Sequence, residues 1–414
     1  MPKVQEVIIK RKSYKVPYLL DTEEGQQILQ SAKSAQQNIY CDCLPEKLLQ
    51  LYVRKCGNGY VLARFPNTGP QHKSDCDDCP TDPTLSGARH YDSGAIKETE
   101  DGYSIRLGVS LRRKERASDD SGLIGTGRDG KPKIKYAKLG LFGLLHFLWT
   151  NSKLNTWRGT SFESNRKWND VAIRINKQLK IMTSKAKEMS GLVVLPRTSN
   201  SLSVNQQLIE IKQKKRRIET QQAIELRILI GHLIRLKASQ YESVGITIED
   251  RNETFWIGNA EWAQAVNACP YPSINRVIRE LPNNKQMERV VIIGRIEHTE
   301  KGNLKFIDLR LMVTTKNFIP VDSSYEKQLS DHLVENERKF EKPLTYDKED
   351  GVFPDFLLTD VEPILPMEVW GMTGNPKYDA RKKTKQENYA GKGGVWEWDH
   401  PELDNIPPLP QADF

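Results

Sequence analysis

The chain has 414 residues, enough for two or three domains, and its 37% hydrophobic and 28% charged residues are typical of a soluble globular protein. This balance excludes a disordered chain, and the longest apolar run, Leu139–Trp149, is too short and too interrupted for a membrane-spanning helix. The formal net charge of +8 is compatible with nucleic-acid binding but does not establish it. The beginning of the chain, MPKVQEVIIKRK, contains no apolar signal region, so we expect a cytoplasmic protein.

Residues 1–116 are predicted to form a β-rich region. A short strand at Val7–Ile9 precedes a polar helix around Glu24–Ser34. The alternating segment LQLYVRKCGNGYVLARFP contains Gly57-Asn58-Gly59 at its centre, and this pattern predicts a β-hairpin. A further strand is expected within Gly102–Leu111.

This region also contains a cluster of cysteines and one histidine. The pattern Cys-x-Cys, a hairpin-like stretch, then His-x-x-x-Cys-x-x-Cys provides the thiolate and imidazole donors of a structural zinc site. In a reducing compartment, disulfides are a poor alternative. We predict Cys41, Cys43, His72 and Cys76 as Zn²⁺ ligands, with Cys79 able to replace one of them. The competing interpretation is a set of free thiols beside a surface histidine.

Residues 136–240 are predicted to be helical. The segment AKLGLFGLLHFLW is apolar nearly all round and should be buried, whereas Trp168, Val171, Ile175 and Leu179 follow the spacing of an amphipathic helix. Two helices followed by the strand-like SGLVVLPR are compatible with a winged-helix, DNA-binding module. A third, long helix is expected over 205–240, and its basic run KQKKRR favours a solvated face over phosphate contact.

Residues 241–414 are predicted to be strand-rich at first and to lead into a separate α/β domain with a core at about 322–399. Gly302-Asn303 predicts a hairpin turn between two strands. After it, Ser323 or Ser324 can cap a helix. Glu326 is expected to share one face of this helix with Leu329, Leu333 and Phe340, which places its carboxylate toward the core.

Two further carboxylates occur in short apolar segments that read as strands, namely Asp355 in FPDFLLTD and Glu368 in MEVWGM. Burial of an ionised carboxylate is costly unless a cation compensates it. Three acids from one helix and two strands provide the oxygen ligands that Mg²⁺ or Mn²⁺ requires. We therefore predict a divalent metal held by Glu326, Asp355 and Glu368, which would activate water for phosphodiester hydrolysis. The alternative is an exposed Asp355 and an ordinary ion pair between Glu368 and Arg381.

The order of these elements resembles that of the PD-(D/E)XK nuclease superfamily: a helix with Glu326, a strand with Pro354-Asp355, a strand with Glu368, a basic helix and a last strand. The wider pattern, FPNTGPQHKSDC followed by PDFLL, MEVWGM and YDARKKTKQENY, resembles a bacterial family encoded on integrating conjugative elements and, more distantly, the competence protein CoiA. The resemblance implies a restriction-endonuclease-like C-terminal domain and a DNA endonuclease or DNA-processing protein of a mobile genetic element. DNA, and other mobile-element proteins, are the expected partners.

One position departs from the superfamily pattern, because the lysine expected two residues after Glu368 is Trp370. The resemblance allows a lysine from the following helix, so we predict Lys385 or Lys382 as the catalytic cation, with Arg381 and Lys383 contacting DNA. A non-catalytic DNA-binding or assembly protein with a degenerate nuclease fold remains the alternative. The sequence offers little support for a small-molecule enzyme, since GLIGTGRDG has neither nucleotide-binding spacing in a strand-to-helix context.

Overall fold

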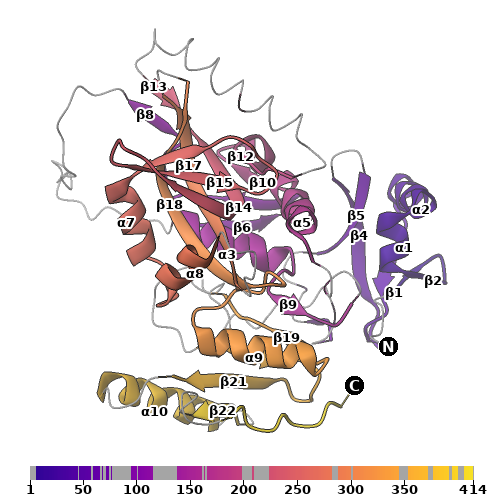
Figure 1. The fold of residues 1–414 in the computed structure, drawn as a ribbon. Helices are drawn as coiled ribbons and strands as arrows, with labels where there is room; N and C mark the ends of the chain where they lie inside the picture. The colour runs from indigo at the N-terminus through magenta and orange to yellow at the C-terminus, as the bar shows by residue number, and fades with distance from the viewer. Residues whose placement is uncertain are drawn as a thin grey trace, which may run out of the picture.

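The chain folds into several β-sheets and a smaller number of helices, so the class is mixed α+β and rich in strands (Figure 1). The structure is a computed structural model. It describes residues 6–44, 46–56, 59–65, 68, 71–73, 76, 95–99, 101–114, 138–160, 163, 166–197, 208, 223–281, 288–299, 302–344, 353–371, 376–390, 394–399 and 405–413. Among these residues, no helix has the length and apolar character needed to cross a membrane.

An antiparallel sheet with the order β2-β1-β3-β4-β5 forms the N-terminal part of the molecule. Its strands and the two helices beside them are β1 (Glu6–Ile9), β2 (Lys12–Lys15), α1 (Val16–Asp21), α2 (Glu23–Ser34), β3 (Ile39–Cys41), β4 (Leu49–Cys56) and β5 (Gly59–Arg64). The pairing of Cys56 with Gly59 confirms the predicted hairpin. Helix α2 begins where the Thr22 side chain accepts a hydrogen bond from the Gly25 N–H at 3.0 Å.

Two helices of the middle region pack beside a small sheet with the order β11-β10-β7-β6. The elements are β6 (Ile96–Thr99), β7 (Gly102–Ile105), α3 (Leu141–Asn151), α5 (Trp168–Lys180), β10 (Met182–Ser184), β11 (Lys187–Glu188) and the short helix η3 (Met189–Gly191). Helix α3 is buried along nearly its whole length, and the apolar stripe of α5 is buried as predicted. A two-stranded sheet joins β8 (Arg112–Lys114) to β13 (Ala223–Glu225).

Five strands at the centre of the chain close into a barrel. They are β14 (Arg227–Ala238), β15 (Ser243–Ile248), β16 (Phe255–Gly258), β17 (Glu288–His298) and β18 (Leu304–Thr315). Each pairs with the next in the order β14-β15-β16-β18-β17, and β17 pairs again with β14. The short strand β12 (Val193–Val194) is added to β14 from outside this ring.

Strand β14 can belong to both ends of the ring because it bends. Its first half pairs with β17 and its second half with β15, and the pairing is irregular between Leu233 and Arg235. Gly231 lies in the first half, where a Cβ atom would approach Ile248 Cδ1 to 3.1 Å. A larger residue would therefore crowd the wall at the bend.

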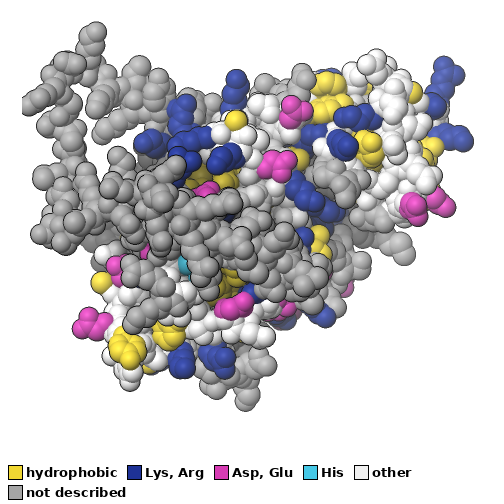
Figure 2. Space-filling view, turned by 90° about the horizontal axis from the view of Figure 1, so that it is seen from above, with side chains coloured by type: hydrophobic (Ala, Val, Ile, Leu, Met, Phe, Trp, Pro, Cys, Tyr) yellow, Lys and Arg dark blue, Asp and Glu magenta, His cyan; other side chains and the backbone are white. Residues whose placement is uncertain are grey.

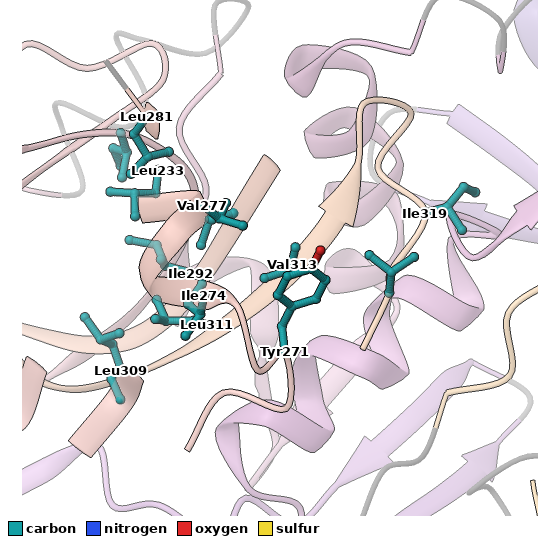
Figure 3. Close-up of a cluster of buried hydrophobic side chains, with 14 of the residues drawn as sticks. Leu233, Tyr271, Ile274, Val277, Leu281, Ile292, Leu309, Leu311, Val313 and Ile319 are labelled. Carbon is teal, nitrogen blue, oxygen red and sulfur yellow. The ribbon is translucent and has the colours of Figure 1, made fainter. Parts of the chain in front are cut away.

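The barrel interior is apolar, and two helices close one end of it. Helices α7 (Asn259–Asn267) and α8 (Ile274–Glu280) connect β16 to β17. Figure 3 shows side chains of α8, such as Val277, lying toward Leu233 of β14 and Ile292 of β17. Burial of this apolar surface is the main stabilising contribution to the barrel.

The predicted long helix over 205–240 is wrong for its last part, since 227–238 form strand β14. Both sides of this strand are covered in its first half: Leu229 faces the barrel interior, and Ile228 and Ile230 belong to a second core beside α3 and α5. A strand buried on both faces shows no alternation, so its sequence cannot be distinguished from that of a buried helix by period alone. Residues 209–222, which include the basic run, lie outside the described residues.

The C-terminal sheet has the order β22-β21-β20-β19-β9, with β22 parallel to β21. Its elements are β9 (Thr156–Trp157), α9 (Ser324–Glu335), β19 (Phe340–Glu341), β20 (Phe356–Leu358), β21 (Leu365–Trp370), α10 (Pro376–Ala390) and β22 (Trp396–Asp399). Helix α10 forms the crossover that a parallel pair needs. The predicted order of helix, two strands, basic helix and strand is confirmed, and β19 is an additional strand.

One detail of this region corrects the prediction. The Ser323 side chain caps α9 by accepting a hydrogen bond from the Glu326 N–H at 3.1 Å, but the helix ends at Glu335. Phe340 therefore lies on β19 and not on the helical face of Glu326. Glu337 has a φ of 56°, a left-handed conformation that turns the chain into the strand.

Candidate functional sites

The four predicted zinc ligands come together beside the N-terminal sheet. Cys41 ends β3 and Cys43 follows it, while His72 and Cys76 come from the segment after β5. Their donor atoms all lie within 4.8 Å of one another. We call Cys41, Cys43, His72 and Cys76 the Cys/His cluster. Cys79, predicted as an alternative ligand, lies outside the described residues.

The spacing within the Cys/His cluster fits a tetrahedral metal site. Cys41 Sγ and Cys76 Sγ are 3.6 Å apart. His72 Nδ1 lies 3.5 Å from Cys43 Sγ and 3.6 Å from Cys76 Sγ. A tetrahedron with Zn–S bonds of about 2.3 Å and Zn–N bonds of about 2.0–2.1 Å has edges of roughly 3.6–3.8 Å. The cluster can therefore hold a metal ion such as zinc, with all four positions supplied by the protein.

The predicted acids divide into two buried pairs, each with a lysine. On α9, Glu326 Oε2 accepts hydrogen bonds from Lys342 Nζ at 2.7 Å and from the Asp322 N–H at 2.9 Å. Burial raises the pKa of Glu326 to about 8 despite the opposing effect of Lys342, and Asp355 and Asp322 add to the rise. Burial alone would lower the pKa of Lys342, but these carboxylates outweigh it and raise that pKa.

On β21, Glu368 is almost completely buried, and its two oxygens accept three hydrogen bonds from two donor side chains. Lys385 Nζ lies 2.9 Å from each carboxylate oxygen, and Tyr389 Oη donates to Oε1 at 2.8 Å. Both donors come from α10, whose spacing of four residues places them on one face. Lys385 also donates to the Phe353 carbonyl at 2.7 Å. Thus Lys385 pairs with Glu368, whereas the side chain of Arg381, the other predicted partner, lies outside what the structure describes.

Asp355 lies immediately before β20, and its charge contributes to the raised pKa of both Glu326 and Glu368. Its backbone N–H donates to the Met367 carbonyl at 3.0 Å, and its Oδ2 accepts from the Val369 N–H at 2.8 Å, which fixes it beside β21. Burial raises the pKa of Glu368 to about 7, and the charge of Asp355 is the next contribution. We call Asp355, Glu368 and Lys385 the acid–lysine site.

The three predicted Mg²⁺ ligands do not form one compact group. Among the described residues, only the Cys/His cluster brings three or more ligating side chains within 4.8 Å of one another. Glu326 is paired with Lys342 and Glu368 with Lys385, and the charge of Asp355 acts on both glutamates. The structure therefore brings Asp355, Glu368 and Lys385 together and places Glu326 in a neighbouring pair.

The second candidate cation, Lys382, has a different environment. It forms an ion pair with Asp399 on β22 and lies 5.2 Å from the centre of the Trp370 ring. Lys385 lies 5.6 Å from the same ring, so both lysines contact its face. Trp370 is buried, and its Nε1 donates to Glu397 Oε1 at 2.8 Å. Trp370 is therefore a packing residue.

Of the predicted DNA-contacting residues, Lys383 is exposed on α10, and the Arg381 side chain is outside what the structure describes. The sequence reasoning missed Lys342, which is buried beside Glu326. A signal was present, because Phe340, Lys342 and Leu344 alternate as a buried strand would, with lysine at an apolar position. A lysine in that position needs an acidic partner.

Comparison with known proteins gives one family. No curated protein and no solved structure matches the chain. The model of a family described as "Protein of unknown function (DUF1173)" matches residues 17–401, which is most of the chain, and the protein therefore belongs to this family.

Proposed function

We propose that the protein is a metal-dependent nuclease that hydrolyses DNA phosphodiesters at the acid–lysine site. The observation that carries this proposal is the convergence of Asp355, Glu368 and Lys385 from β20, β21 and α10. Two neighbouring carboxylates with a buried lysine are suited to binding a divalent cation and to stabilising the negative charge that develops on a phosphodiester.

Each residue has a role in this proposal. The carboxylates of Asp355 and Glu368 would hold Mg²⁺ or Mn²⁺, which polarises a phosphodiester and lowers the pKa of bound water. Lys385 compensates the charge of the buried Glu368 and is the cation that would face the phosphate oxygens. Tyr389 is a positioning residue, since its hydroxyl orients Glu368 through Oε1. Glu326 is a further carboxylate near Asp355.

The order of elements around the site supports the resemblance to PD-(D/E)XK nucleases. Helix α9, strands β20 and β21, helix α10 and strand β22 follow in the order expected from the sequence. Lys385 pairs with Glu368 from α10, which is where a replacement for the lysine missing at Trp370 is expected. DNA processing by a mobile genetic element remains the biological context that this resemblance suggests.

The proposal assigns zinc, in a structural role, to the Cys/His cluster. Two of its ligands belong to β3 and the turn after it, and two to the segment that follows β5. A metal would tie this segment to the sheet, whose apolar core is small. Four protein ligands leave no position for a substrate, so the cluster is not a second catalytic site.

The test is a cleavage assay on linear, nicked and single-stranded DNA with Mg²⁺ or Mn²⁺. Asp355→Asn, Glu368→Gln and Lys385→Met should each reduce the rate by at least about 100-fold, whereas Glu387→Gln, exposed on the same helix, should not. Cleavage that persists in the three site variants would show that another protein is responsible for it.

A non-catalytic DNA-binding or assembly protein is the second candidate. It is favoured by the three hydrogen bonds that already occupy the Glu368 carboxylate and by Trp370 in place of the expected lysine. Salt-dependent DNA binding without metal-dependent turnover would support it. The winged-helix module stays a prediction; because α3 is buried, such a module would have to use α5 to contact DNA.

A further inference from the structure

The connectivity of the barrel is informative. We number β14, β15, β16, β17 and β18 as the first to fifth strands of the barrel. Around the ring, the first strand is followed by the second, the third, the fifth and the fourth, which pairs with the first again. The third and fifth strands, β16 and β18, are parallel, and helices α7 and α8 lie between the third and fourth. This is the five-stranded Greek-key arrangement of the OB-fold, in which the second and third strands and the adjoining loops contact ligands.

Within the described part of the chain, apolar packing covers the outer surface of β14 and β17. Outward residues of β14 and β17, such as Ile230 and Ile293, pack in the core that contains α3 and α5. The outward residues of β15 and β16, in contrast, belong to none of the apolar clusters formed by described residues.

A tryptophan lies at the centre of this uncovered part. Across the strands, Lys237 pairs with Gly245, Gly245 with Trp256, and Trp256 with Lys305. Residues directly opposite one another point to the same face of a sheet. At Gly245 a Cβ atom would lie 3.1 Å from Trp256 Cζ3, so the glycine leaves room for the indole ring on the sheet surface. The ring is thus half-buried between two lysines.

Three exposed basic residues surround the ring, and Glu242, in the turn beside Tyr241, is an exposed acidic residue. Arg235, Lys237 and Lys305 are exposed, and none of them has an ion pair with another described residue. The acidic neighbour in the row is Glu297, opposite Lys305 on β17, and it is buried. Figure 2 shows that Lys and Arg side chains are common on the face seen from above, with acidic side chains among them. The positive charge beside Trp256 is therefore available to an anionic ligand.

A second aromatic residue lies at the end of the same hairpin. Tyr241 is in the turn between β14 and β15, and its relative exposure of 76% is far above that of a packing residue. It precedes Gly245 by four residues, which is at most about 14 Å along a strand. We define the β15–β16 face as Arg235, Lys237, Tyr241, Trp256 and Lys305.

We propose that the β15–β16 face binds single-stranded nucleic acid, with bases stacked on Trp256 and Tyr241 and phosphates near Arg235, Lys237 and Lys305. Proteins that bind single strands combine exposed aromatic rings with nearby basic side chains. The bases of a single strand are free to stack on such rings, whereas the bases of a duplex are already stacked and paired. This site is distinct from the acid–lysine site and does not depend on catalysis.

The test is binding of a fluorescent oligothymidylate of about 15 nucleotides to the full-length protein without added divalent metal. Tyr241→Ala should weaken binding about tenfold, and Trp256→Ala at least as much, while Trp256→Phe retains most of the affinity. Lys237→Ala and Lys305→Ala should each lower the slope of log K against log salt by about 0.7. Leu48→Ala, exposed just before β4, and Lys12→Ala, exposed on β2, are the matched controls.

Two results would overturn the proposal. One is unchanged affinity in Tyr241→Ala, a substitution of an exposed turn residue that leaves the barrel core intact. The other is equal competition by duplex DNA or by polyglutamate, which carry charge without accessible bases. Asp355→Asn should bind the oligonucleotide like the wild type, so failure of the nuclease proposal and failure of this one are distinguishable.

Discussion

At the scale of single residues, the buried pair of Glu368 and Lys385 has the largest expected effect on stability. Lys385→Met leaves Glu368, of which 1% is exposed, without its cation, and we expect a loss of about 3 kcal/mol in the free energy of unfolding. Lys383→Met, on the exposed side of α10, should change it by less than about 0.5 kcal/mol. Chemical denaturation measures both.

A double variant separates a lost contact from an uncompensated charge. Adding Glu368→Gln to Lys385→Met removes the unpaired carboxylate, so the double variant should be more stable than Lys385→Met alone. If the two substitutions simply add, the pair is not coupled, and the assignment of Lys385 as the counter-ion of Glu368 is wrong.

A second residue-scale prediction concerns His232 on β14. Burial lowers its pKa from 6.5, and Arg289 acts in the same direction, whereas the hydrogen bond with Glu249 opposes the shift. The unfolded chain therefore takes up a proton at higher pH than the folded protein. The stability contributed by neutral His232 is complete above about pH 6.5 and is lost as the pH falls below it.

His232→Gln should accordingly show a smaller loss of stability than the wild type between about pH 7 and pH 5. Urea denaturation at several pH values measures the difference, and His332→Gln on α9 is the matched control. Parallel pH profiles for the wild type and His232→Gln would mean that another group is responsible.

At the scale of elements, the Cys/His cluster should contribute to the stability of the N-terminal sheet. Zinc chelation, or Cys76→Ser, is expected to destabilise this sheet by at least about 2 kcal/mol, because a metal held by the cluster would connect β3 to the segment after β5. Hydrogen exchange should show lost protection in β3 and unchanged protection in β17. Cys269→Ser, outside the cluster, should leave the zinc content measured by elemental analysis unaltered.

Elements with one exposed face were predictable from the sequence. The stripe of α5 was found because helical spacing follows from one-sided burial, whereas the hairpins at β4–β5 and β17–β18 were found from the Gly and Asn residues of their turns. Strand β14 was missed because both its faces are buried in its first half. The closure of the barrel could not be inferred at all, since it depends on the pairing of β14 with β17, more than fifty residues apart.

The same distinction holds for the candidate sites. The Cys/His cluster was predictable because only a few residue types bind zinc and their spacing is characteristic. The acids of the C-terminal region were predicted individually, but their partners Lys342 and Lys385 decide which of them come together. Ion pairing depends on tertiary contacts that no local pattern specifies.

At the scale of the whole molecule, the barrel and the C-terminal sheet share one apolar core. Leu233 and Ile292 of the barrel belong to the same buried cluster as Leu329 of α9 and Phe356 of β20. The tail 405–413 adds to this core through Ile406 and Leu409. A continuous core fixes the position of one part relative to the other.

This connection predicts how the two proposed sites act together. A single-stranded nucleic acid bound to the β15–β16 face would keep the adjoining duplex near the acid–lysine site, and this would raise the local concentration of the substrate there. DNA with a single-stranded tail should therefore have a KM at least about tenfold lower than blunt duplex of the same length.

The variants distinguish binding from chemistry in this experiment. Tyr241→Ala should raise KM for tailed DNA without changing kcat, because the aromatic ring contributes equally to the bound substrate and to the transition state. It should have no effect on blunt duplex, and Asp355→Asn should abolish turnover of both substrates while tailed DNA still binds. Equal KM values for tailed and blunt DNA would show that the barrel does not deliver substrate to the acid–lysine site, whatever each site does alone.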